Sequence, residues 1–149
     1  MRELEGKVAL ITGAGQGVGQ GIALALASEG CHLVLAGRTL SKVEETARLV
    51  AERGGKAVAV ACNVKEAADL EAAVQKAVSE FGGLDILVNN AQEVPNGPLD
   101  KVTDEAFMAG FVSGPLASFR LMKLARPIMA ARGGGTIVNL ASSAGIRWD

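Results

Sequence analysis

Glycines gather in one turn close to the N-terminus of this 149-residue sequence. The segment 12–19 reads TGAGQGVG and lies between a short apolar run and a helical pattern. Such a turn can wrap a pyrophosphate, because glycine admits positive φ angles and close backbone approach while the following helix offers free N–H groups. The spacing is neither GxGxxG nor a GxxxxGK[ST] loop. The pattern favours a dinucleotide site, and a purely structural tight turn is the alternative.

A second candidate residue follows the second apolar run. Dinucleotide sites expect an acid about 20 residues after the glycine turn, where it binds the ribose 2′-hydroxyl. Residues 36–39 read AGRT, so this stretch holds Arg38 and no carboxylate. Because a guanidinium fits a phosphate with two hydrogen bonds, Arg38 favours NADP(H) as cofactor, with NAD(H) still possible. The alternative is that Arg38 is a solvated loop cation.

Alternating apolar runs and helical patterns must position these residues. We expect buried strands at 8–11, 32–36, 57–61, 84–88 and 136–141. Helices are expected from the glycine turn to Gly30, from a Ser41–Glu44 capping box to about Arg53, and from an Asn63–Glu66 pair to residue 81. Short connections imply right-handed parallel βαβ units. The sequence therefore predicts one α/β domain over residues 1–149, a Rossmann-like, doubly wound parallel sheet in three αβα layers.

The last expected helix contains an unusual pair. Thr103 is predicted to cap it, it runs to about Arg132, and Gly114-Pro115 falls in its middle. Pro115 has no N–H to donate to the Phe111 carbonyl, and its ring crowds that turn. We predict a kink here, with two helices meeting at a turn as the alternative.

Composition excludes several classes of protein. Fifteen basic and 16 acidic side chains give a net charge of −1, which argues against nucleic-acid binding. No apolar run is long enough to span a membrane and no signal-peptide core is present, so we expect a cytoplasmic protein without a membrane partner. Cys31 and Cys62 are expected to be buried thiols, with no metal site. His32 is interpreted as structural and Asp85 as a local hydrogen-bonding anchor. Tyrosine is absent.

Three motifs in order resemble the short-chain dehydrogenase/reductase family: TGAGQGVG at 12–19, NNA at 89–91 and GGTIVNLASSAG at 134–145. The resemblance covers residues 4–146 and implies hydride transfer between a nicotinamide cofactor and an alcohol or carbonyl substrate, commonly in a dimer or tetramer. It implies that the cofactor contacts come from three places, namely the glycine turn at the pyrophosphate, the end of the third strand at the adenine and the end of the fourth strand at the nicotinamide ribose. Carried over by position, these are Gly13, Gly15, Gln16, Gly17, Val18 and Gly19, then Asn63 and Val64, then Asn90 and Ala91.

The same resemblance makes Ser142 the catalytic serine, which hydrogen-bonds the substrate oxygen as charge builds during hydride transfer. A serine pair at a strand end is otherwise typical of a turn-forming hydroxyl. Three positions depart from the family pattern: Asn63 replaces Asp, Gln92 replaces the glycine of NNAG, and Gly114 replaces a helix asparagine. The family's active-site tyrosine and lysine would fall beyond the last residue of this sequence.

These departures leave two main hypotheses. The first is an NADP(H)-preferring oxidoreductase whose chain continues, so that the 149-residue segment is inactive alone and its sheet is incomplete at the C-terminal side, with an exposed apolar edge. The second is a non-catalytic nucleotide-binding or interaction module, and a gene remnant is a weaker third. For Gly114-Pro115 we hypothesise a freed main-chain carbonyl that holds a water of the proton relay.

Overall fold

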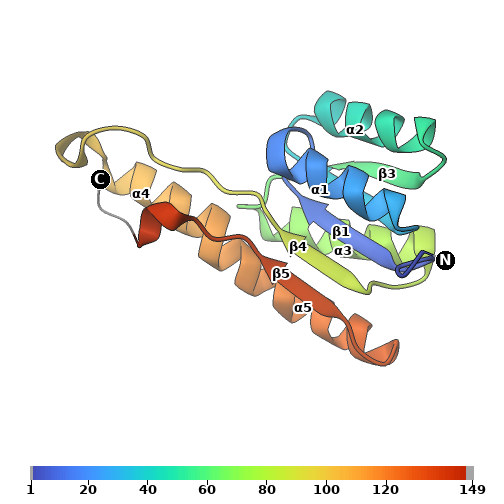
Figure 1. Cartoon of the computed structure of the whole chain (residues 1–149). Helices are drawn as coiled ribbons and strands as arrows, with labels where there is room; N and C mark the ends of the chain where they lie inside the picture. Colours follow the sequence, from blue (N-terminus) through green and yellow to red (C-terminus); the bar gives the residue numbers. More distant parts are fainter. Residues whose placement is uncertain (1, 147–149) are drawn as a thin grey trace.

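Residues 2–146 are described by the computed structural model, in which the strands form one parallel sheet (Figure 1). The order across this sheet is β3-β2-β1-β4-β5. The predicted strands are confirmed, although β4 starts two residues later and β5 ends two residues earlier than expected. Their bounds are β1 Val8–Thr12, β2 His32–Gly37, β3 Lys56–Ala61, β4 Ile86–Asn89 and β5 Thr136–Asn139.

Helices cover both faces of the sheet, which confirms the three-layer Rossmann-like architecture. Along β1, Ala9 and Ile11 pack with α1 and α2, whereas Val8 and Leu10 pack with α3 and α5. This alternation follows from the two-residue period of a strand, and a strand buried on both faces is apolar throughout. The helices are α1 Gly17–Ser28, α2 Leu40–Glu52, α3 Ala67–Phe81, α4 Asp104–Phe111 and α5 Ala117–Ala131.

Two of the predicted helix starts are wrong. Helix α2 begins at Leu40 after Thr39, so the Ser41–Glu44 box lies inside the helix and does not cap it. Helix α3 begins after Glu66, and Asn63 Oδ1 instead accepts a hydrogen bond from the Lys65 N–H at 3.1 Å, which closes a turn ahead of the helix. Asn and Ser compete with helix bonding in this way because their short side chains reach nearby backbone groups.

The other helix-end predictions are confirmed. Thr103 caps α4, since its Oγ1 accepts a hydrogen bond from the Ala106 N–H at 3.1 Å. The interruption at Gly114-Pro115 is a π-helical segment, η2 Val112–Leu116, between α4 and α5. Helical backbone angles continue on both sides, so the two helices do not meet at a turn. The wider π turn accommodates a proline that cannot make the regular helix bond.

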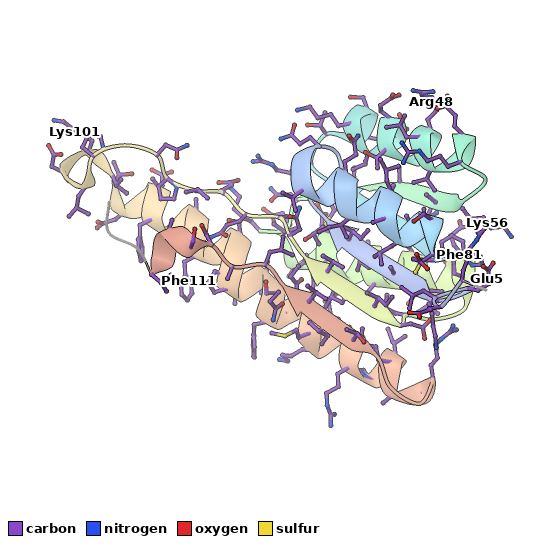
Figure 2. The ribbon with its side chains drawn as sticks, in the orientation of Figure 1. Glu5, Arg48, Lys56, Phe81, Lys101 and Phe111 are labelled. Carbon is purple, nitrogen blue, oxygen red and sulfur yellow. The ribbon has the colours of Figure 1, made fainter. Side chains whose placement is uncertain are left out.

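The cysteines and the histidine were expected to have structural roles. Cys31 and Cys62 are buried, as predicted. Burial, followed by the nearby carboxylates, raises the pKa of each thiol to about 11, so both remain protonated near neutral pH. His32 packs against Phe81, which is labelled in Figure 2, with 5.2 Å between the ring centroids and the ring planes tilted by 41°. None of the helices within residues 2–146 is long and apolar enough to cross a bilayer.

Asp85 is a hydrogen-bonding anchor, as predicted, but its partners lie in distant elements and not in its local segment. Its Oδ2 accepts a hydrogen bond from the Val8 N–H at 2.9 Å, at the start of β1. Arg132, after α5, donates from Nε to Oδ1 and from Nη2 to Oδ2, both at 3.0 Å. Burial alone would raise the pKa of this carboxyl, but the hydrogen bonds from Arg132 and Val8 outweigh it, and the pKa lies below its usual value.

The far edge of the sheet is packed differently. Strand β5 pairs with β4 in parallel register, Ile86 opposite Thr136 through Asn89 opposite Asn139. All four β5 residues are exposed within the described part of the chain, including the apolar Ile137 and Val138. The exposed apolar edge expected after the fifth strand is therefore present.

Candidate functional site

The sheet order creates a crevice at one end of the molecule. Strand β1 lies between β2 and β4, and the connections that leave the carboxyl ends of β1 and β4 run to opposite faces of the sheet, toward α1 and α5 respectively. Ligands of doubly wound folds bind at such a point, beyond the carboxyl ends of the strands. A cavity of about 350 Å³ lies there. It brings together every predicted cofactor residue except Gly19, namely Gly13, Gly15, Gln16, Gly17, Val18, Arg38, Asn63, Val64, Asn90 and Ala91.

The glycine turn forms the wall of the cavity next to α1. Gly13 and Gly17 have φ angles of 62° and 53°, which side-chain-bearing residues rarely adopt. Helix α1 begins at Gly17, and the side chain of its N-cap Gln16 makes no capping hydrogen bond. The N–H groups of the first turn therefore remain available to an anion, which the helix dipole also favours. Gly19 lies beneath the turn, where a Cβ would overlap the Gly13 carbonyl oxygen, so it allows close packing and does not line the cavity.

Thr12 and Asn90 fasten the turn to the end of β4. The Thr12 hydroxyl oxygen accepts hydrogen bonds from the N–H groups of Asn90 and Ala91, both at 3.0 Å. The Asn90 amide donates to the carbonyls of Thr12 at 3.1 Å and Gly13 at 3.2 Å. These contacts give Asn90 a scaffolding role that its position in the motif did not reveal. Sequence reasoning missed Thr12, although it directly precedes the first glycine.

Charged side chains from three loops and from α2 meet at or beside the cavity, whose lining includes Arg38, Lys42 and Glu93. Arg38 Nη1 lies 2.8 Å from Glu93 Oε1, and Lys65 Nζ lies 2.9 Å from the same oxygen. Lys42 Nζ donates to Gln16 Oε1 at 2.8 Å beside the glycine turn. Sequence reasoning identified Arg38 and missed the other three charged groups, because nothing in their spacing links them. The end of β2 has no carboxylate of its own, but the fold brings one there from Glu93, which lies 55 positions after Arg38 in the sequence.

Two of the residues that depart from the family pattern, Gln92 and Gly114, lie next to each other in the structure. A Cβ built on Gly114 would stand 3.1 Å from Gln92 Nε2, so the Gln92 side chain covers the helix position that lacks one. Next to it, the buried Ser113 hydroxyl accepts a hydrogen bond from the Glu93 N–H at 2.8 Å. The π segment and the loop after β4 are therefore in direct contact, a relation that the sequence alone did not indicate.

Ser142 is not among the residues that line the cavity. It is exposed, and its Oγ accepts a hydrogen bond from the Ala144 N–H at 3.2 Å at the start of the 3₁₀ turn η3 Ser143–Gly145. These contacts are those of a turn-forming hydroxyl. A catalytic role for this serine stays a prediction.

Comparison with known proteins agrees with this geometry. Residues 7–148 match the family model described as short chain dehydrogenase. An uncharacterized oxidoreductase of Thermotoga maritima is 43% identical over 95% of this chain and 56% of its own length. Galactitol 2-dehydrogenase of Agrobacterium fabrum is 39% identical over 98% of this chain and 56% of its own length.

Solved structures give the same result. A 7α-hydroxysteroid dehydrogenase, determined in complex with NADH and 7-oxo glycochenodeoxycholic acid, superposes with a TM-score of 0.93 at 32% identity. The match covers 98% of this chain and 57% of that protein. The chain therefore spans little more than half the length of the relatives that it matches.

Proposed function

The chain belongs to the short-chain dehydrogenase family, and on that premise we propose that the complete protein transfers hydride between NADP(H) and an alcohol or carbonyl substrate. The observation that carries the proposal is the cavity at the crossover point between β1 and β4. It combines uncapped helix N–H groups, glycines at close approach and a cationic rim, which together suit a phosphorylated dinucleotide.

The residues present fit this cofactor. The turn Gly13–Gly19 would hold the pyrophosphate, and a Cβ on Gly15 would come within 2.9 Å of Lys42 Cβ, so the wall tolerates little more than glycine there. Asn63 and Val64 would border the adenine, and Asn90 and Ala91 the nicotinamide ribose. Arg38 would bind the 2′-phosphate, which is the basis for proposing NADP(H) ahead of NAD(H).

The bound nicotinamide would supply the hydride, and the protein would orient the substrate and stabilise its oxygen. We assign the latter task to Ser142, whose hydroxyl would donate a hydrogen bond to the substrate oxygen as negative charge develops. The segment contains no tyrosine and so supplies no phenolic proton donor of its own. We therefore propose that these 149 residues bind cofactor without turnover.

The π segment supports a further part of this proposal. Pro115 cannot donate to the Phe111 carbonyl, and Gly114 has no side chain to offer. A main-chain carbonyl in this segment would hold a water of the proton relay, in place of the family's helix asparagine. Its position beside the loop after β4, which lines the cavity, is the supporting observation.

The substrate is proposed only as a class. Three of the matched relatives are named for galactitol, a 12α-hydroxysteroid and cyclohexanol, and these substrates have in common a carbon that bears a hydroxyl group. We also propose a cytoplasmic homo-oligomer, a dimer or tetramer, on family resemblance.

Cofactor binding is tested by titrating NADP⁺ and NAD⁺ calorimetrically into the chain and into Arg38→Asp, with the exposed Arg126→Asp on α5 as the matched control. Arg38→Asp should weaken NADP⁺ binding about tenfold or more relative to NAD⁺, since a charge-assisted phosphate contact is lost and a repulsion is added. The control should match the unmodified chain. Absence of binding by the unmodified chain would contradict the function, and an unchanged ratio in Arg38→Asp would contradict the cofactor preference.

Ser142 is tested in the complete protein by comparing Ser142→Ala with Ser143→Ala. We expect kcat to fall by about 100-fold or more in the first and little in the second, because only one hydroxyl would meet the developing charge. Equal turnover in both variants would remove the assignment.

A further inference from the structure

One carboxylate oxygen at the cavity is shared by two cations. Glu93 Oε1 lies 2.8 Å from Arg38 Nη1 and 2.9 Å from Lys65 Nζ. The three residues come from separate connections, those after β2, after β3 and after β4. Arg38 and Glu93 both line the cavity, so this ion pair crosses part of the space that a dinucleotide would occupy.

The backbone on two sides of this cluster is held in place. The Glu93 N–H donates to Ser113 Oγ at 2.8 Å, and Ser113 is only 1% exposed. The Lys65 N–H donates to Asn63 Oδ1 at 3.1 Å. The side chains of Glu93 and Lys65 are 27% and 31% exposed, well below the 64% of Arg38. The Glu93 backbone is thus held by a contact to a buried hydroxyl, while its carboxylate is partly exposed and is positioned by two cations at once, unlike an isolated surface ion pair.

Two cations that converge on one oxygen make a natural phosphate site. A phosphate monoester carries nearly two negative charges and three acceptor oxygens, so it can bind both cations more strongly than one carboxylate does. Glu93 takes part of that space and cancels one of the two charges. A 2′-phosphate that reaches Arg38 must displace Glu93, whereas a ribose with a free 2′-hydroxyl can donate a hydrogen bond to the carboxylate.

We propose that Glu93 is a specificity-determining residue that competes with the cofactor 2′-phosphate for Arg38 and Lys65, and so limits the preference for NADP(H). This proposal rests on the proposed function, because it requires the cavity to bind a nicotinamide dinucleotide. It assigns Lys65 as a second phosphate-binding cation beside Arg38.

The test is calorimetric titration of NADP⁺ and NAD⁺ into the unmodified chain, Glu93→Gln and Glu105→Gln, an exposed carboxylate on α4. Glutamine keeps the shape of Glu93 and removes its charge. We expect Glu93→Gln to bind NADP⁺ about five- to tenfold more tightly, with NAD⁺ binding unchanged or weakened, because two partly exposed ion pairs no longer oppose the phosphate. Glu105→Gln should change neither affinity.

A second set of variants ties the effect to the two cations. In an Arg38→Ala/Lys65→Ala background, adding Glu93→Gln should raise the NADP⁺ to NAD⁺ affinity ratio less than it does in the unmodified chain. There the substitution relieves only the direct repulsion between carboxylate and phosphate, because no cation is left for which the two compete. Glu93→Asp, which is one methylene shorter, should give an intermediate gain, and it replaces Glu93→Gln if thermal unfolding shows that variant to be unfolded.

The outcomes separate the two proposals. If the unmodified chain binds neither nucleotide, the proposed function fails and this inference fails with it. If it binds nucleotides but Glu93→Gln leaves the ratio of the two affinities unchanged or lowers it, the competition by Glu93 is refuted and the proposed function stands. A gain of undiminished size without both cations also refutes it, because Glu93 would then act independently of Arg38 and Lys65.

Discussion

Strands β1 and β5 are both parallel, apolar strands, but they are packed in opposite ways. Every residue of β1 is buried between helices on the two faces of the sheet, and every residue of β5 is exposed. Ile11 is fully buried and Ile137 is 37% exposed. Backbone pairing therefore suffices to define a strand, whereas most of the stabilisation by burial belongs to the β1–β2 half.

The proposed site is divided in the same way between a packed half of the molecule, around β1 and β2, and an exposed side, around β5. The cavity is lined by the glycine turn and by the ends of β2, β3 and β4, next to the packed half. Helix α4 and the loop before it extend beyond the sheet (Figure 1), and Phe111, labelled in Figure 2, is about half exposed. Ser142 also lies on this exposed side. Nucleotide binding should therefore depend on the packed half, which can be tested directly.

The largest expected effect comes from one substitution made in both regions. Ile11→Ala should lower the free energy of unfolding by about 2–5 kcal/mol, because it leaves a cavity in a filled core. Ile137→Ala should lower it by less than about 1 kcal/mol, since water already reaches that side chain. Urea unfolding followed by circular dichroism measures both. Similar losses in the two variants would show that β5 is as well packed as β1.

Asp85 links the two regions, so its removal should come next in size. Asp85→Asn should reduce the free energy of unfolding by about 1–3 kcal/mol at neutral pH, because the Arg132 ion pair and part of the Val8 contact are lost. The pKa of Asp85 is lowered in the fold, so its stabilisation is complete above the unfolded-state pKa of about 4 and disappears as pH falls through the lower, folded-state pKa.

The pH dependence provides the control for this prediction. Stability of Asp85→Asn should fall less steeply with acidification below about pH 4 than stability of the unmodified chain, as seen by thermal unfolding at successive pH values. Parallel curves for the two proteins would mean that Asp85 carries no ionic stabilisation.

Gly19 and Gly21 are both in α1, but only Gly19 lies against the glycine turn of the proposed site. Gly19→Ala places a Cβ on the Gly13 carbonyl oxygen, so the turn must shift, with a loss of about 1–3 kcal/mol and weaker nucleotide binding. Gly21→Ala meets nothing within 4 Å and should stabilise the helix by about 0.5–1 kcal/mol with binding unchanged. Nucleotide titration and thermal unfolding of both variants check this. Equal binding by the two would show that the turn does not hold the ligand.

The smallest effect on stability is expected at Gly114 in the π segment, which contacts the cavity residue Gln92. Gly114→Ala should change stability by less than about 1 kcal/mol, because the helix gains propensity while the Gln92 side chain must yield slightly. Removing that side chain with Gln92→Ala should make Gly114→Ala more favourable, and a double-mutant cycle measures the coupling. Strict additivity would show that the two residues do not interact.

The strands, the helix pattern and the glycine turn were predictable because they depend on local periodicity and on local backbone freedom. Arg38 and the turn residues were found in the same way, since each lies at the end of a recognisable strand. The helix starts at Ser41 and Asn63 were predicted wrongly, because a capping pattern competes with other hydrogen bonds that the same side chains can make.

The sequence by itself determined the doubly wound fold and the position of the glycine turn, because alternating apolar patterns and glycine content act within a few residues. Only the tertiary structure decided that Glu93 meets Arg38 and Lys65, that Gln92 covers Gly114, and that Asn90 fastens the turn. These contacts join separate loops at the carboxyl ends of parallel strands, and their partners follow from strand order across the sheet, which no local pattern encodes.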